Sequence, residues 1–322
     1  MTLPAHITRR LRLPLIAAPM LRVSGPELVI AACRSGVVGA FPTLNARDAS
    51  GLDDWIVRIV AELKDGPRPA APWCPNLIMH REPAALRADV ACLVRHGVEM
   101  VITSVGSPAP VVEPLHDAGC LVFADVATIK HARKAIDAGA DGLILLTAGA
   151  GGQTGWLNGF AFVRAVRAFF DGPVVLAGGV GDGASLLAAQ VLGCDLAYMG
   201  TGFIATQESM APDAYRQMLV DASADDVVLT RALNGIPASL LAPSLRAAGL
   251  DPATLDESIT PEKARELFSQ VKGGNRPARW KDVWSAGHSV SAVSAINTTA
   301  ALVERIEREY LNARRQFAAG GA

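Results

Sequence analysis

VVLAGGVGDGASLLAAQVLGCDLAYMGTGF, residues 174–203, is the stretch that decides the fold of this chain. Two short apolar runs, 174–177 and 196–199, each end in a glycine loop, and the residues between them have the length of a helix. Short apolar runs without polar alternation are typical of strands that are buried on both faces. The stretch therefore predicts a strand–helix–strand unit of a parallel sheet.

The same unit recurs along the first two thirds of the chain. The predicted strands are residues 15–20, 38–43, 73–79, 100–105, 121–126, 142–146, 174–177 and 196–199. Helical segments follow nearly all of them, at 26–34, 46–63, 83–96, 109–118, 128–138, 160–169, 183–192 and 212–222. Eight such units in roughly 200 residues predict an α/β fold of the TIM (β/α)8 barrel type. A doubly wound sheet would give the same alternation, but glycine loops after strands seven and eight favour the barrel.

The pattern breaks after Ala222, where apolar and mixed-charge segments replace the strand–helix units. We therefore expect three parts: a barrel at 1–222, a small, mainly helical insertion on the substrate side at 223–293, and a C-terminal helix at 294–322. This last helix is expected to pack back on the barrel, and Ser294 is its expected N-cap.

Composition bounds the class of partner. The 30 basic and 31 acidic residues give a net charge of -1, which offers no electrostatic footprint for nucleic acid or an anionic membrane. No apolar run reaches the ~18 residues of a membrane span, and the start lacks a signal-peptide pattern. We expect a cytoplasmic protein with a small-molecule substrate; the sequence leaves open whether it forms a homodimer. The five scattered cysteines predict reduced packing residues.

The two glycine loops of the opening stretch predict a phosphate site. Glycine lets backbone N–H groups approach an anion without a Cβ in the way. The candidate phosphate-binding residues are Gly178, Gly179, Gly200 and Thr201. The N-terminus of the helix that begins near Gly183 is expected to add its dipole to the same anion.

A third glycine-rich loop, residues 147–155, contains Gln153 and offers Ala150 and Gly151 as residues that wrap a flat ring. A flexible crossover is the alternative reading. Gln153 can orient a ligand but cannot act as a general base, because an amide does not accept a proton at neutral pH.

Further candidates lie at other strand ends and near the C-terminus. Asn76 is a polar anchor or a satisfied core amide. Pro19 and Met20 suit a surface for an aromatic ring. Asp125 either bonds a cofactor hydroxyl or ring nitrogen or caps the next helix. His288, which follows a run of small residues, either faces the site or lies at the surface.

As a set, these motifs resemble those of the nitronate monooxygenase family, formerly 2-nitropropane dioxygenases, which are FMN-dependent TIM barrels. The motifs are Pro-Met at 19–20, Asn-Leu at 76–77, Ala-Gly-Gly at 150–152, Gly-Gly at 178–179, Met-Gly-Thr at 199–201 and Trp-Ser-Ala-Gly at 284–287. The resemblance implies FMN as cofactor. It implies that Pro19, Met20 and Asn76 contact the flavin, and that the glycine loops hold its phosphate.

Two departures from the family pattern concern catalysis. The family usually has histidine after Ala-Gly-Gly, where this chain has Gln153, and often has glutamine where this chain has His288. Our hypothesis is that His288 lies across the flavin from Gln153 and supplies the lost imidazole, so both are candidate catalytic residues. A third departure is Gly202, where relatives commonly have arginine.

The resemblance implies an FMN-dependent monooxygenase that oxidises alkyl nitronates with dioxygen to carbonyl compounds and nitrite. A reductase that uses NAD(P)H and a quinone or enoyl thioester is the alternative, and its pyrophosphate would meet basic residues of the C-terminal third: Lys272, Arg276, Arg279 and Lys281. A non-catalytic flavin-binding protein and a non-flavin phosphate-binding barrel are the minor alternatives.

Overall fold

Eight parallel strands close into a barrel in this computed structural model, which describes residues 3–46, 48–65, 69–233, 235–263 and 281–320. The strands are β1 (Leu15–Ala17), β2 (Val38–Pro42), β3 (Trp73–Ile78), β4 (Met100–Ser104), β5 (Leu121–Val126), β6 (Gly142–Leu146), β8 (Val174–Ala177) and β9 (Leu196–Met199). Closure is complete because β1 pairs with β2 on one side and with β9 on the other. The predicted TIM barrel is confirmed, and the doubly wound sheet is excluded.

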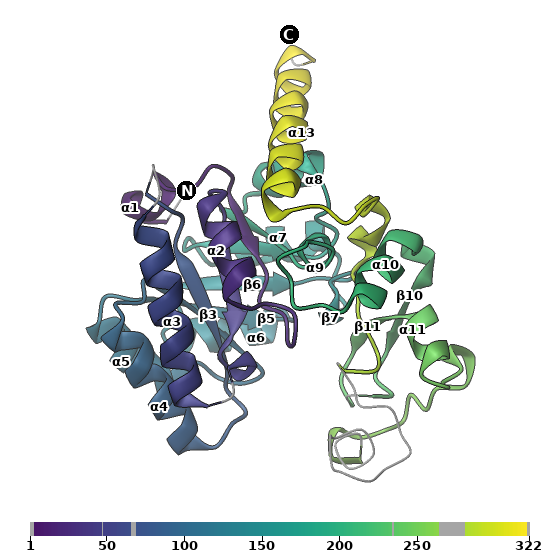
Figure 1. Cartoon of the computed structure of the whole chain (residues 1–322), viewed down its shortest axis with the longest axis horizontal. Helices are drawn as coiled ribbons and strands as arrows, with labels where there is room; N and C mark the ends of the chain where they lie inside the picture. The colour runs from purple at the N-terminus through teal and green to yellow at the C-terminus, as the bar shows by residue number, and fades with distance from the viewer. Residues whose placement is uncertain (1–2, 47, 66–68, 234, 264–280, 321–322) are drawn as a thin grey trace.

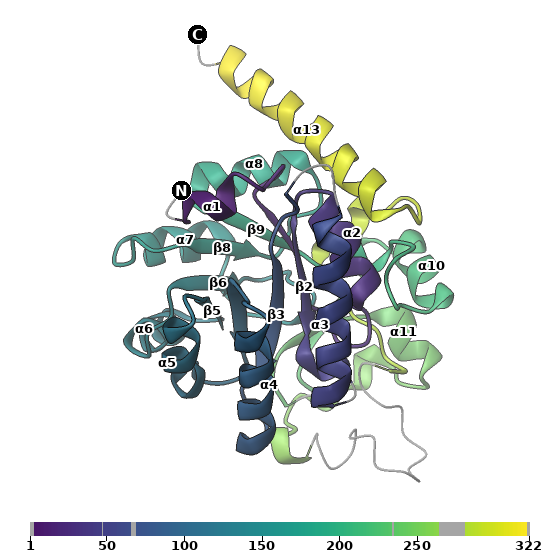
Figure 2. The same ribbon diagram turned by 60° about the vertical axis from the view of Figure 1, so that its left-hand side comes forward.

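Helices surround the barrel (Figures 1 and 2). Those that follow the first seven barrel strands are α2 (Pro26–Arg34), α3 (Ala49–Lys64), α4 (Pro83–Arg95), α5 (Ala109–Asp117), α6 (Ile129–Asp137), α7 (Gly159–Arg167) and α8 (Gly183–Leu192). The long C-terminal helix α13 (Thr299–Ala319) packs against both α8 and α2, which is the place of the eighth barrel helix. Its last turns project beyond the body of the molecule in both views.

The barrel interior is filled by side chains from alternate positions of the strands. Its apolar layers include Ile16, Cys74, Ile102, Phe123 and Leu196, all fully or almost fully buried. The short helix α1 (Ala5–Thr8) places Ile7 against the same cluster.

Two residues further along β3, β4, β5 and β9, at the carboxyl end, the interior side chains become polar. Because alternate residues of a strand share a face, Asn76, Ser104, Asp125 and Tyr198 form this upper layer. The change from apolar to polar side chains marks the end of the barrel at which active sites of this fold lie.

Between β9 and α13 the chain forms a second unit beside the barrel mouth. It contains α9 (Thr201–Ile204), α10 (Asp213–Asp221), β10 (Val227–Thr230), β11 (Ala238–Leu241) and α11 (Ala242–Ala247), together with the 3-10 helices Ala224–Asp226, Pro252–Thr254 and His288–Ala292. The antiparallel pair β10–β11 was not predicted. It continues onto β7 (Gly152–Gln153), so a strand of the insertion pairs with the loop that carries Gln153.

Helix α10 packs in the same apolar cluster as Ala286, Val290 and Val293. Because α13 and not α10 takes the place of the eighth barrel helix, we propose that the insertion begins just after β9. The division expected at residue 222 would then move toward the N-terminus. The helix α13 begins at Thr299 with Thr298 as its N-cap, whose side chain accepts from the N–H of Ala301, so the expectation that Ser294 caps it was wrong.

The close packing of α8 against α13 predicts that a larger residue at Gly183 lowers the stability of the protein. A Cβ at Gly183, the first residue of α8, would lie 2.0 Å from the backbone nitrogen of Tyr310 in α13. Gly183→Ala should therefore push the two helices apart and destabilise the protein by about 1–3 kcal/mol, as overpacking does. The measurement is a thermal or urea unfolding curve.

Gly51→Ala in α3 is the matched control. A Cβ there meets only Oδ1 of Asp48 at 3.6 Å, so the same substitution should be neutral or slightly stabilising. An unchanged midpoint for Gly183→Ala would contradict the close packing of α8 and α13.

Among the described residues, no helix is both long and apolar enough to cross a membrane.

All five cysteines are free and buried, and burial raises the pKa of the Cys33, Cys120 and Cys194 thiols to about 12. Lys272, Arg276 and Arg279, the basic residues considered for a pyrophosphate, lie outside the described residues. Lys281 is described and exposed.

Candidate functional site

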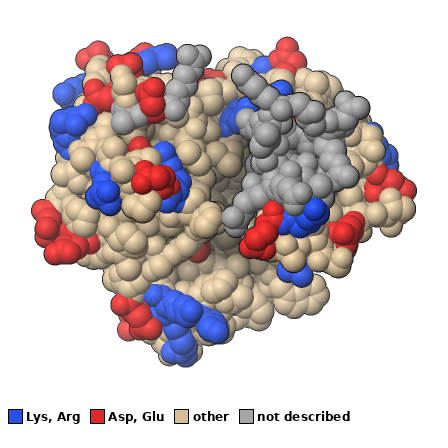
Figure 3. Space-filling view, turned by 90° about the horizontal axis from the view of Figure 1, so that it is seen from below, with Lys and Arg blue, Asp and Glu red and all other residues tan. Residues whose placement is uncertain are grey.

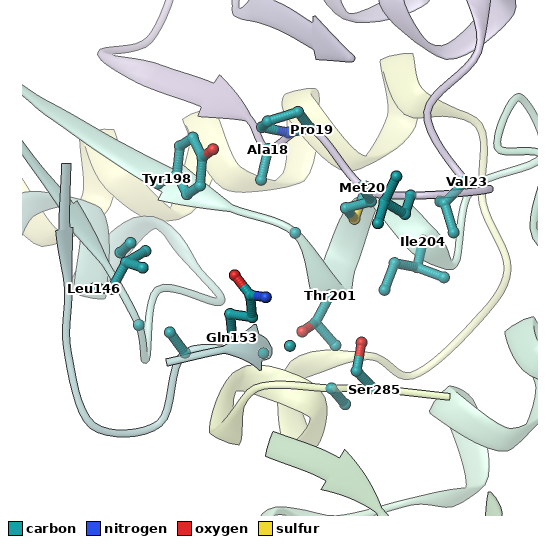
Figure 4. A pocket seen from close by; sticks show the side chains of 18 of the residues that line it. Ala18, Pro19, Met20, Val23, Leu146, Gln153, Tyr198, Thr201, Ile204 and Ser285 are labelled. Atoms are coloured by element: carbon teal, nitrogen blue, oxygen red, sulfur yellow. The ribbon is translucent and has the colours of Figure 1, made fainter. Parts of the chain in front are cut away.

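A cavity of about 220 Å³ opens at the carboxyl ends of the barrel strands (Figure 4). All the predicted site residues except His288 line it. They are Pro19, Met20, Asn76, Asp125, Ala150, Gly151, Gln153, Gly178, Gly179, Gly200 and Thr201. In Figure 3 the face seen from below is hollowed near its centre, and basic and acidic side chains are interspersed around the hollow.

The wall formed by the ends of β8 and β9 carries a set of free backbone donors. Within the described residues, the N–H groups of Gly178, Gly179, Val180, Gly200 and Thr201 have no hydrogen-bond acceptor. Backbone N–H groups that lack water must find an acceptor, and a run of them is a ready anion site. These donors therefore fit a phosphate group in the place that the glycine loops predict.

Glycine is required in this wall for steric reasons. Gly178 and Gly179 have φ of 124° and 73°, which is a region that side chains other than glycine rarely adopt. A Cβ at Gly178 would lie 2.4 Å from Oγ1 of Thr147, whereas a Cβ at Gly179 would meet nothing within 4 Å. Gly178 therefore lets the wall pack closely against the loop that carries Thr147. Gly179 faces open space.

N–H groups at the start of α8 donate to protein side chains, and the expected contribution of the helix dipole to the anion site stays a prediction. The N–H groups of Gly181 and Asp182 donate to Oγ of Ser185, and the N–H of Ser185 donates to the Asp182 carboxylate. The N–H of Gly183 donates to Oε2 of Glu309 in α13, at 3.0 Å. Protein side chains thus satisfy these donors, and Asp182 is the helix cap, as predicted.

The floor of the cavity is the polar layer of the barrel. The Asn76 amide donates to the carbonyl of Ile102 and to the hydroxyl of Ser104, so it is held by the protein and still faces the cavity. Asp125 keeps some exposed surface, but its Oδ1 atom is buried and has no partner among the described residues. It does not cap α6, because the Thr128 hydroxyl does so.

Two buried groups in this floor have perturbed acidity. Burial raises the pKa of the Asp125 carboxyl to about 7. Burial and, less strongly, the nearby Asp125 carboxylate hold the pKa of Tyr198 well above its ordinary value. Tyr198 was missed in the sequence, although its position two residues after the interior residue Leu196 places it on the same face.

The loop that carries Gln153 is fixed from two sides. Its residues Gly152 and Gln153 pair with Ser239 and Ala238 of β11, and the N–H of Thr154 donates to the carbonyl of Pro237. The Thr154 hydroxyl donates to the carbonyl of Thr147 at 2.8 Å, which closes the loop on itself. The flexible-crossover reading is therefore wrong. In Figure 4 the Gln153 amide points into the cavity.

His288 is not placed to act over the ring site. It is exposed and is not among the residues that line the cavity. Its backbone N–H donates to the carbonyl of Gly149 at 2.9 Å, and its imidazole packs where a Cβ of Gly149 would be. The hypothesis that His288 replaces the lost imidazole is therefore wrong, because a base must come within hydrogen-bond reach of the proton it takes.

Trp284, in the segment before His288, and Tyr215 of α10 line the cavity and were not predicted as site residues. The rings of Trp284 and Tyr215 stack with centroids 5.0 Å apart, and both line the cavity. The Tyr215 hydroxyl donates to the carbonyl of Ser285, and the N–H of Gly287 donates to Oγ1 of Thr201 at 3.0 Å. Tyr215 belongs to one apolar cluster with Val23 and Ile204, and Met20 and Trp284 pack against the same cluster.

A model of the nitronate monooxygenase family matches residues 71–309, which include most of these cavity residues. The chain belongs to the nitronate monooxygenase family. The resemblance read from the motifs is thereby confirmed, and family membership makes this chain an oxidoreductase.

Relatives within and around the nitronate monooxygenase family differ in their reactions. A nitronate monooxygenase of Paraburkholderia phytofirmans is 29% identical, covering 95% of this chain and 95% of the relative. A Rhodococcus jostii protein named as a dehydrogenase of a hydroxy-methyl-oxo-octahydroindene carboxyl-CoA is also 29% identical, over 71% of this chain and 62% of its own length.

Two solved structures are similar to this chain over almost its whole length. FabK from Thermotoga maritima superposes with a TM-score of 0.81 and 26% identity, covering 99% of both chains. A nitroalkane oxidase from Streptomyces ansochromogenes has a TM-score of 0.78 and 26% identity, covering 97% of this chain and all of its own. The nitronate monooxygenase fold therefore extends over almost the whole of this chain.

Proposed function

We propose that the cavity binds FMN. The free N–H groups at the ends of β8 and β9 would hold its phosphate, and the tight backbone of Ala150 and Gly151 would form the wall beside its ring. Asn76 and Asp125 would face the ring from the barrel side. The unpartnered donors and the unpartnered Asp125 oxygen support this assignment, because each needs a polar ligand atom.

Bound FMN supplies a two-electron acceptor, which the protein's own groups do not provide. The reaction that we propose is the oxidation of an alkyl nitronate, with dioxygen, to a carbonyl compound and nitrite. One observation favours an anionic nitronate over a neutral nitroalkane. Among the described residues that line the cavity there is no histidine, lysine or arginine, and the Gln153 amide points into the cavity.

Gln153 can donate a hydrogen bond to a nitronate oxygen but cannot remove the proton from a neutral nitroalkane. Stacked Trp284 and Tyr215, together with Met20 and Val23, would cover the carbon chain of the substrate and keep water away. The protein would thus select a substrate that has already lost its proton.

The test measures nitrite release and oxygen consumption with a nitronate and with the parent nitroalkane. Nitroalkane solutions must be freshly prepared at low pH, so that little nitronate is present at mixing. The nitronate should react at least about 100-fold faster, because general-base catalysis contributes 10²–10⁴-fold, the group assigned to the substrate is the Gln153 amide, and the Asp125 carboxyl is assigned to the barrel side of the ring. Equal rates would contradict the proposal.

A second candidate is a redox reaction of a thioester, with NAD(P)H as a possible electron donor to FMN. The coenzyme A ester dehydrogenase of Rhodococcus jostii and the FabK fold favour it. In that reaction the Gln153 amide would donate to the thioester carbonyl. Bleaching of bound FMN by NADH or NADPH, followed by reoxidation by an enoyl thioester, would select this candidate.

A further inference from the structure

The carboxyl group of Asp125 has no structural task in the barrel. It lies at the carboxyl end of β5, on the face that carries Phe123 below it, and it lines the cavity. Its Oδ1 atom is buried and has no hydrogen-bond partner in the described part of the chain, whereas the neighbouring Asn76 amide donates to two protein atoms. A buried carboxyl without a hydrogen bond destabilises the fold, so a ligand group is the remaining reason to place it there.

The floor has a second polar group without a hydrogen-bond partner among the described residues. Tyr198 also lines the cavity, and its hydroxyl makes no hydrogen bond to another described residue. Figure 4 shows its ring at the cavity wall beside Ala18 and Leu146. Asp125 on β5 and Tyr198 on β9 thus offer two uncommitted polar groups from separate strands of the barrel.

The charge environment of Asp125 is simple. Of the titratable groups near it, Tyr198 comes from β9 and Cys74 from β3, and burial keeps both of them neutral by raising their pKa values well above the ordinary range. The adjacent strands β4 and β6 contribute Ser104 and Leu146 to the cavity, which do not titrate. No charged partner among these groups fixes the carboxyl in one protonation state.

We propose that Asp125 contacts the bound FMN ring from the barrel side and exchanges one proton with solvent there. It would donate a hydrogen bond to a ring acceptor as a carboxylic acid and accept one as a carboxylate. Tyr198 provides a second polar contact whose hydroxyl stays protonated. The inference rests on the proposed FMN site and adds a residue of this chain that senses the charge of the ring.

A raised acid pKa also predicts the pH dependence of the apoprotein. Because the folded-state pKa of Asp125 is about 7 and that of an unfolded aspartate is near 3.9, the unfolded carboxyl loses its proton first and stability falls as the pH rises. The cost is absent well below pH 3.9, where both states are protonated, and it is complete above about pH 7. Asp125→Asn should therefore raise the melting temperature of the apoprotein more at pH 8 than at pH 4.5.

The decisive experiment follows the visible absorption spectrum of the FMN-loaded protein between pH 5.5 and 8.5, with free FMN titrated in parallel. The natural protein should show a one-proton spectral change that free FMN lacks, and Asp125→Asn should lose it. Tyr198→Phe should keep the change and weaken FMN binding, because it removes a contact without removing the titrating group.

The outcomes separate the two claims. Failure of the natural protein to bind FMN would overturn the proposed function and this inference together. Binding of FMN with no spectral change in the natural protein, or with the same change in Asp125→Asn, would overturn this inference alone. Melting curves of the apoproteins at pH 4.5 and 8 check that each variant folds.

Discussion

Replacing Gly179 with aspartate should weaken FMN binding by at least about 100-fold. Gly179 lies in the wall of free N–H donors, and a Cβ there meets no atom within 4 Å, so the side chain would extend into open space. A carboxylate roughly 5 Å from a phosphate costs about 3 kcal/mol per pair of unit charges at an effective dielectric constant of about 20. A tenfold change in affinity corresponds to about 1.4 kcal/mol.

Gly179→Asn is the matched control for that variant. Asparagine and aspartate both tolerate the left-handed backbone at φ 73° and have the same shape, so backbone strain affects the two variants alike. Quenching of FMN fluorescence on titration of each apoprotein measures the two affinities. Equal affinities for the aspartate and asparagine variants would show that the phosphate is not bound at this wall.

The second large effect is expected at Gln153. Gln153→His places an imidazole on the loop that β11 holds beside the cavity, and its ordinary pKa near 6.5 suits a general base. The variant should oxidise neutral nitroalkanes at least about 10-fold faster than the natural protein, with activity that rises as the imidazole loses its proton. Initial rates of nitrite release between pH 5.5 and 8 measure the gain.

Gln153→Ala tests the role that the amide has in the natural protein. A hydrogen bond to a charged oxygen contributes about 1.5–3 kcal/mol, so loss of the amide should lower kcat/KM for a nitronate by roughly 10–100-fold. The FMN spectrum should stay unchanged, because Gln153 is not assigned to the phosphate wall or the barrel floor. Full activity of Gln153→Ala would remove Gln153 from the reaction.

The barrel could be predicted from the sequence because its strands are buried on both faces. Such strands are continuous apolar runs, and β6, β8 and β9 begin and end at the predicted residues. The glycine loops were predictable for a related reason, since a wall that needs left-handed backbone and free N–H groups has few alternatives to glycine.

Contacts between segments that are distant in sequence could not be predicted from local sequence patterns. The donors of α8 are satisfied in part by Glu309, which is 126 residues away from Gly183 in sequence. The β10–β11 pair lacks a short hairpin turn, so no short sequence motif predicted it. His288 looked catalytic because small residues precede it, but those residues serve the close approach of Gly287 to Gly149 and Gly151.

Asp125 shows how much a sequence position can suggest and where it stops. Its place at a strand end indicated either a cofactor contact or a helix cap, and Asp125 was predicted to bind the cofactor. The structure excludes the helix cap because Thr128 caps α6, and Oδ1 of Asp125 has no hydrogen-bond partner among the described residues.

The central claim is that this chain uses FMN to oxidise a nitronate. The most direct measurement is anaerobic rapid mixing of the FMN-loaded protein with an alkyl nitronate, and separately with NADH and NADPH, while the flavin absorbance is followed. We predict rapid bleaching by the nitronate, slow or no bleaching by either nicotinamide, and recovery of the absorbance on admission of air. Rapid bleaching by NADH or NADPH, with none by the nitronate, would contradict the account.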